Sequence, residues 1–141
     1  MGSHDPKKAQ QEIISDFNLF DSWLDRYQYL IDLGKALKPL DESEKTDDIL
    51  LHGCQSRVWL IIDGDVDALR IRANSDAAIV SGLIALLIRF YSGASARQIL
   101  DIQPEFITAI GLEQHLSATR ANGLHAMVQA IHATAKSFKE N

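Results

Sequence analysis

Residues 49–72 carry the sequence ILLHGCQSRVWLIIDGDVDALRIR, and this stretch decides the fold. Short apolar runs at 49–51 and 57–62 flank a polar break that contains a glycine, and Asp63-Gly64 is typical of a hairpin turn. Beyond that turn, leucine and isoleucine alternate with arginine, which is the two-residue period of a half-buried strand. The stretch therefore predicts three antiparallel strands, with the polar break as the turn between the first two.

Helical patterns lie on both sides of this predicted sheet. Capping residues, apolar stripes at three- and four-residue steps and helix-ending Gly or Pro set their limits. The expected helices run from Asp5-Pro6 to about Phe17, from a cap at Asp21 to a loosened end at Gly34, from a cap at Ser75 to about Tyr91, from Ser95 through Leu100, from Pro104 near Phe106, and along a final stripe from Leu124 to Phe138.

The order of helices, then strands, then helices predicts an α+β domain. The chain has 141 residues, which is the size of one domain, so we expect a single domain over 1–141. In it, N- and C-terminal helices pack on a small three-stranded antiparallel sheet. Residues 1–4 resemble the remnant of an expression tag, and His4 is therefore left out of functional reasoning.

Composition excludes several classes of protein. The formal net charge of -5 argues against a nucleic-acid binder, because such domains usually carry a basic stripe. The longest uncharged apolar run, Ala77 to Ile88, falls well short of the ~20 residues that a membrane span needs. The N-terminal region lacks the apolar core of a signal peptide, so we expect a cytoplasmic protein that does not insert into membranes.

The single cysteine, Cys54, is the one nucleophile with an unusual setting. It excludes an internal disulfide framework and a metal centre built from several thiolates. Its neighbours Gly53 and Gln55, with His52 before and Arg57 after, are those of an accessible loop thiol rather than of a core cysteine. Polar or positive neighbours lower the pKa of a thiol and so raise the fraction of reactive thiolate. Spacing alone leaves a reactive thiol and an idle loop cysteine equally supported.

The remaining chemistry-bearing residues predict no metal or nucleotide site. His125 and His132 are seven residues apart on the last helix, roughly 10.5 Å along its axis, which is too far for one metal ion. We expect both to be solvated surface residues. A couple between His52 and Cys54 is not expected, because neighbouring loop positions rarely aim side chains at each other. The spacing of the aromatic residues favours core packing over a ligand cage (Trp23, Tyr27, Tyr29, Trp59).

Four blocks of the chain together resemble the SufE/CsdE family of sulfur-acceptor proteins. The blocks occur in consistent order and cover most of the chain. They are the opening WLDRYQYLIDLG at 23–34, the core GCQSRVW at 53–59, the helix start SDAAIVSGL at 75–83, and the segment from Gly111-Leu112 through His115-Leu116 to TRANGL at 119–124.

The resemblance implies a SufE/IscU-like fold and a role in sulfur transfer. Cys54 would take persulfide sulfur from a cysteine desulfurase of the SufS or CsdA type, stimulate that enzyme, and pass the sulfur to an iron–sulfur scaffold or another acceptor. No cofactor of its own is implied, since the pyridoxal phosphate belongs to the desulfurase. The alternative is a binding regulator of the desulfurase whose loop thiol is idle. A free-standing thiol enzyme would need a positioned base or a second cysteine, which the sequence does not offer.

Further residues are candidates for supporting the thiol or contacting the partner. Gln55 and Arg57 would lie next to the partner's active site, together with His52 and Gly53. Asp76 and Arg120 would hold the loop in a closed resting form. The competing interpretations are a helix cap for Asp76 and a surface ion pair for Arg120.

Overall fold

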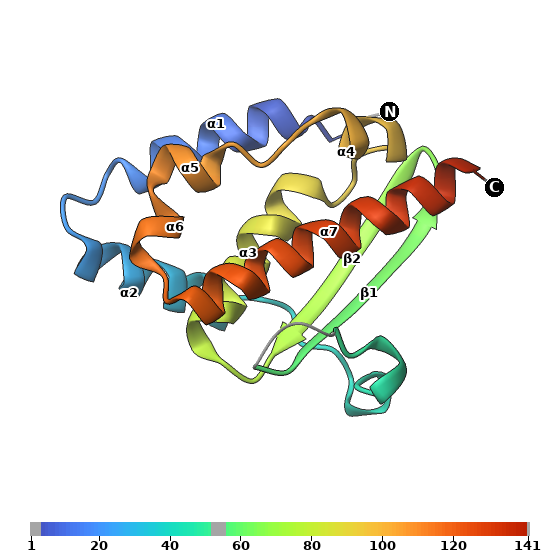
Figure 1. Ribbon diagram of the computed structural model, residues 1–141, viewed down its shortest axis with the longest axis horizontal. Coiled ribbons are helices and arrows are strands. Elements are labelled where there is room, and N and C mark those ends of the chain that lie inside the picture. Colours follow the sequence, from blue (N-terminus) through green and yellow to red (C-terminus); the bar gives the residue numbers. More distant parts are fainter. Residues whose placement is uncertain (1–3, 52–55, 141) are drawn as a thin grey trace.

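Two antiparallel strands, β1 (Val58–Asp65) and β2 (Ala68–Ser75), form the one sheet found among the residues that the structure describes. The structure is a computed structural model, and it describes residues 4–51 and 56–140. The strands pair without a break, from Val58 opposite Ser75 at the base to Asp65 opposite Ala68 at the tip. Figure 1 shows the hairpin crossing one side of the molecule, with the helices on its inner side.

The prediction of a third strand at 49–51 is wrong. Ile49 is the last residue of the 3-10 helix η2 (Asp47–Ile49), so too few residues remain to form a strand. Only an isolated bridge survives, between Leu50 and Trp59, together with one hydrogen bond of 2.8 Å from the Leu51 N–H to the Val58 carbonyl. The predicted first strand is therefore reduced to a single point of attachment on the edge of β1.

The hairpin also turns later than the Asp63-Gly64 pair predicts. Gly64 lies within β1, opposite Leu69, and adopts a positive φ of 100° there. The chain reverses after Asp65, whose Oδ1 accepts hydrogen bonds from the N–H groups of Asp67 and Ala68 at 2.9 and 3.1 Å. This local carboxylate turn replaces the predicted turn, because an aspartate side chain can close a reversal on the following backbone N–H groups.

The helices follow the sequence pattern closely. Their bounds are α1 (Pro6–Phe17), α2 (Trp23–Lys35), η1 (Glu42–Glu44), α3 (Ala78–Tyr91), α4 (Ala96–Asp101), α5 (Phe106–Ile110), α6 (Leu112–His115) and α7 (Ala118–Glu140). The expected α+β class with helices packed on a small antiparallel sheet is confirmed. In Figure 1, α3 lies in the middle, between the hairpin, α7 and the N-terminal helices.

Capping residues set two of the helix starts as expected. Asp5 accepts from the Lys7 N–H at 3.1 Å, and Ser95 forms a capping box with Gln98. Two starts differ from the prediction. Ser22, not Asp21, caps α2 by accepting from the Asp25 N–H at 3.2 Å. The Ser75 hydroxyl accepts from the Ala77 N–H, but α3 begins only at Ala78.

The backbones of α2 and α3 cross in close contact. A Cβ placed on Gly82 of α3 would lie 2.2 Å from the Leu30 carbonyl oxygen, and one on Gly34 of α2 would lie 2.8 Å from the Gly82 nitrogen. Both glycines therefore let the two helix backbones touch. The prediction that Gly34 loosens the end of α2 is wrong, because the helix continues through Lys35.

The prediction that His132 is a solvated surface residue is wrong. Its Nε2 lies 2.9 Å from the hydroxyl of Tyr91, a fully buried residue of α3. Burial lowers the pKa of His132 and raises the pKa of Tyr91. His125 does lie at the surface, with its side chain 52% exposed and its Nε2 3.8 Å from Glu113.

We expect Gly82→Ala to destabilise the protein. In an unconstrained helix this change would stabilise by about 1 kcal/mol, because alanine has the higher helix propensity. Here the new methyl group meets the Leu30 carbonyl, so the free energy of unfolding should fall by about 2 kcal/mol or more. Urea unfolding followed by circular dichroism measures the difference. A variant as stable as the unaltered protein would contradict the backbone contact.

We expect His132 to make the protein less stable in mild acid. Its pKa in the folded chain lies below the usual 6.5, so the unfolded chain binds the proton first as the pH falls. The stability is therefore complete above about pH 6.5 and declines below it. His132→Gln should flatten this decline in urea midpoints measured between pH 5 and 7.5. His125→Gln, the control on the same helix, should retain it.

Candidate functional site

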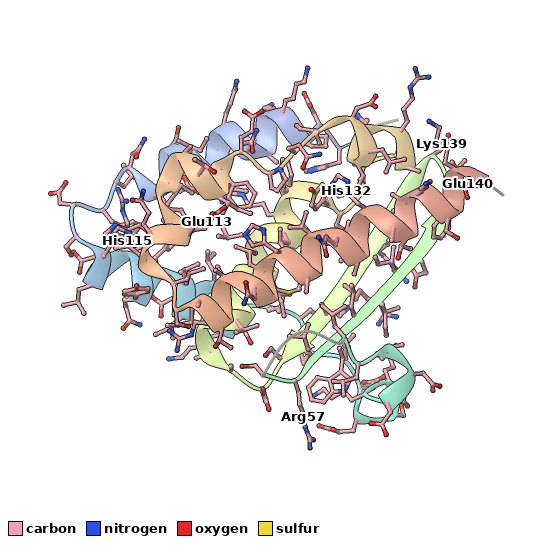
Figure 2. The ribbon with its side chains drawn as sticks, in the orientation of Figure 1. Arg57, Glu113, His115, His132, Lys139 and Glu140 are labelled. Carbon is pink, nitrogen blue, oxygen red and sulfur yellow. The ribbon has the colours of Figure 1, made fainter. Side chains whose placement is uncertain are left out.

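Two hydrogen bonds, one to a side chain and one to the main chain, tie the start of β1 to the turn that precedes α3. The Arg57 N–H donates to Asp76 Oδ1 at 3.1 Å, and the Asp76 N–H donates to the Arg57 carbonyl at 3.4 Å. The Asp76 carboxylate thus accepts a hydrogen bond from Arg57 instead of capping a helix. The N-cap of α3 is Ala77, which makes no side-chain capping bond. Figure 2 shows the Arg57 side chain pointing away from the hairpin base. Asp76 is a clamp on the base of β1 rather than a helix cap.

Four of the predicted site residues lie outside the described residues: His52, Gly53, Cys54 and Gln55. The described chain on either side is fixed by backbone bonds. Before them, the Leu51 N–H is bonded to the Val58 carbonyl at 2.8 Å. After them, Arg57 is held by Asp76 in the way just described. The predictions for the four residues stay predictions.

A narrow pocket of about 20 Å³ opens beside Ser56. Its volume admits a group of about the size of one water molecule, so it is far too small for an organic cofactor. The pocket brings Arg120, from the first turn of α7, to the same place as Ser56. The full lining is Ser56, Val80, Leu83, Thr119, Arg120, Gly123, Leu124 and Met127.

The apolar wall of this pocket was missed as a functional feature in the sequence. Val80 and Leu83 are three residues apart on α3, and Leu124 and Met127 are three residues apart on α7. Each pair lies on one face of its helix, which sequence periodicity reads as core packing. These side chains line a pocket because Ser56 lies next to them. The periodicity of a helix does not indicate which residue from another part of the chain will lie there.

A second cluster joins the opening block to the segment before α7. The Trp23 ring stacks on the His115 imidazole, with ring centroids 3.9 Å apart and planes 13° apart. The Tyr27 hydroxyl donates to the His115 carbonyl, and the Arg26 guanidinium lies 5.1 Å from the Trp23 ring centroid. These rings pack against one another and against α6, so the packing expected of Trp23 and Tyr27 is confirmed.

Within residues 4–51 and 56–140, no group of three His, Cys, Asp or Glu side chains is arranged to hold a metal ion. No helix in these ranges is both long and apolar enough to cross a bilayer. Some acidic residues form ion pairs within the fold, such as Asp16 with Arg89 at 2.7 Å and Glu44 with Arg72 at 3.0 Å.

Comparison with known proteins identifies close relatives. An uncharacterised SufE-like protein of Rhizobium etli is 42% identical over 130 residues, which cover 89% of this chain and 88% of the relative. Another, from Rhizobium meliloti, is 41% identical over 130 residues, with 89% and 93% covered. The solution structure of a hypothetical protein from Thermus thermophilus shares the fold, with a TM-score of 0.76 at 21% identity over 94% of this chain and 97% of that one.

The sequence model of the SufE family, described as an Fe-S metabolism associated domain, matches residues 11–135. This range contains both strands, the Asp76 clamp on Arg57 and the pocket beside Ser56. The chain therefore belongs to the SufE family of proteins associated with iron–sulfur metabolism.

Proposed function

We propose that this protein accepts sulfur on Cys54 from the persulfide of a pyridoxal-phosphate-dependent cysteine desulfurase. It then delivers that sulfur to an iron–sulfur scaffold or another acceptor, in the cytoplasm, and it stimulates the desulfurase. Family membership supports the link to iron–sulfur metabolism. The single observation that carries the finer proposal is that the only cysteine of the sequence falls between Leu51 and Arg57, two positions held by backbone hydrogen bonds.

The transfer is an exchange between sulfur atoms. A Cys54 thiolate attacks the outer sulfur of the desulfurase persulfide, so a new S–S bond forms on Cys54 and the S–S bond of the partner breaks. The partner's cysteine leaves as a thiolate, the transferred sulfur keeps its proton, and no external oxidant or reductant is consumed. The protein must supply access and a sufficient thiolate fraction. It needs no metal and no cofactor of its own for this step.

The anchors around the thiol support this chemistry in two ways. The hydrogen bond between the Arg57 N–H and Asp76 fixes the base of β1. When a partner protein docks on the residues that precede β1, the paired hairpin therefore resists displacement. The pocket beside Ser56 offers an apolar wall and the Arg120 side chain. We assign Asp76 and Arg120 to holding a closed resting form, in which a persulfide would be protected from reductants and oxidants. Arg57 and Gln55 then lie at the interface with the desulfurase.

Cys54→Ser should abolish sulfur acceptance without unfolding the protein, because a hydroxyl cannot form a persulfide. The unaltered protein, incubated with a desulfurase, pyridoxal phosphate and free cysteine, should gain the mass of one or more sulfur atoms. Intact mass spectrometry after removal of reductant measures this gain, and treatment with a reducing agent should reverse it.

The same experiment separates the proposal from its rival. A Cys54→Ser protein that still carries sulfur would end the carrier proposal. If the mass of the unaltered protein is unchanged while the variant stimulates the desulfurase fully, the protein is a binding regulator with an idle thiol. Desulfurases of both the SufS and the CsdA type belong in the test.

Asp76→Ala should raise the reactivity of Cys54 toward a thiol reagent severalfold. The variant removes the carboxylate that accepts from the Arg57 N–H, so the base of β1 loses its clamp. Arg120→Ala should act in the same direction. The control is Asp21→Ala, which removes an exposed carboxylate from the loop before α2. Rates equal to those of the control for both variants would refute the resting-state assignment.

A further inference from the structure

A pocket of about 410 Å³ lies between the end of α2, α3 and the edge of β2. Its volume is within the range of small-molecule pockets, roughly 300–1,000 Å³. The apolar walls come from two helices and one strand: Leu33 and Leu37 from α2 and the residues after it, Ala85 and Ile88 from α3, and Ile71 from β2. The pocket is therefore a candidate site for a ligand with an apolar part.

Small residues keep this space open. Three lining positions are alanines, Ala36, Ala73 and Ala85, where longer side chains would fill the pocket. Larger apolar residues of the walls, such as Leu33 and Ile88, pack against the core but are only partly buried. Apolar surface therefore remains exposed in the pocket, and covering it with an apolar group is favourable.

The charged side chains that line the pocket are all basic, in a chain whose formal net charge is -5. Arg70 and Arg72 are paired with Asp63 and Glu44, and neither of these acids lines the pocket. Lys38 is exposed and forms no ion pair with any described residue. A ligand with one negative charge is complementary to this lining, and Lys38 is the cation with which it can pair.

Asn74 holds the backbone of Lys38 beside β2. Its Nδ2 donates to the Lys38 carbonyl at 3.4 Å and to the Ala73 carbonyl at 2.8 Å. Its Oδ1 accepts from the Leu40 N–H, so the amide group is bonded on both of its sides. Asn74 is buried, which shields these bonds from water. The segment that carries Lys38 is therefore fixed next to Ala73.

The N–H of Ala73 is an open donor at the same place. Leu69 directs its N–H and C=O away from β1, where they bond to the loop at 92–94. Because direction alternates along a strand, the N–H of Ala73 points to the same side. Among the described atoms this N–H has no hydrogen-bond partner. The Ile71 carbonyl has none either and would repel an anion, so a negative group fits at the Lys38 end of the pocket.

We propose that this pocket binds a free carboxylic acid with an apolar tail, such as a medium-chain fatty acid. The carboxylate accepts from the Ala73 N–H and pairs with the Lys38 ammonium group. The tail lies between Leu37 and Ile88 and covers apolar surface that is otherwise exposed. The site is independent of the sulfur-transfer proposal, because none of the described residues assigned to that reaction lines the pocket.

The probe is decanoate, at concentrations below those at which it forms micelles. Isothermal titration calorimetry should show one site with a dissociation constant below about 1 mM. Octanoate should bind roughly tenfold more weakly, because its tail buries two fewer methylene groups. Decanol should also bind roughly tenfold more weakly, because it lacks the charge-assisted bonds. In NMR spectra of the labelled protein, decanoate should shift the Ala73 amide resonance. Cys54→Ser should bind decanoate equally, which separates this proposal from the sulfur-transfer one.

Variants locate the binding site. Ala85→Leu places a larger side chain in the pocket and should abolish decanoate binding, while a well-dispersed amide spectrum shows that the variant is folded. Lys38→Gln changes an exposed side chain and should weaken the binding of decanoate about tenfold but leave that of decanol unchanged. Lys139→Gln, at the far end of α7, makes the same change in net charge and should have no effect.

Three outcomes would overturn the proposal. Equal affinity for decanoate and decanol would remove the role of the carboxylate. Unaltered decanoate binding by both Ala85→Leu and Lys38→Gln would place the ligand elsewhere on the protein. Cosedimentation with phosphatidylglycerol vesicles, without any binding of free decanoate, would assign the basic residues of the pocket to a lipid surface instead.

Discussion

The backbone contact between α2 and α3 is the constraint on which the other arrangements depend. Because Gly82 brings α3 against the Leu30 carbonyl, α3 lies at the centre of the fold with a neighbour on every side. The turn before it carries Asp76, and one of its faces forms the wall beside Ser56. Ala85 and Ile88, on another face, line a pocket of about 410 Å³ together with Ile71 of β2. A wider spacing between the two helices would displace all three features together.

The helices were predictable because their signals are local. Asp5 with Pro6 and Ser95 with Gln98 set helix starts through contacts within a few residues, and apolar stripes revealed the buried faces. The family blocks were equally readable, since each is a continuous run of sequence. The hypothesis that Asp76 and Arg120 hold the thiol loop rests instead on their positions in the chain.

Contacts between distant residues were not predictable in the same way. His132 is half-buried because Tyr91, 41 positions away, meets it from another helix. Residues 49–51 are of types that favour strands, but Ile49 is instead the last residue of the 3-10 helix η2. The partner of Asp76 is the backbone of Arg57, and a main-chain N–H leaves no trace in the residue types. Propensity and periodicity describe one element at a time, whereas these outcomes depend on which elements meet.

The unbroken pairing of the hairpin also sets which changes of length the protein can tolerate. Extra residues at 66–67 would extend the tip and leave all the pairs in place. Loss of one residue inside β2 would instead turn Ile71 and Ala73 outward, because alternate positions face opposite sides of a sheet. The same one-residue slip would bring Ala77 opposite Arg57 in place of Asp76. Deletion of an odd number of residues within β2, far from the thiol, would therefore turn the buried side chains of the strand to the wrong face of the sheet. It would also break the hydrogen bond between Asp76 and Arg57.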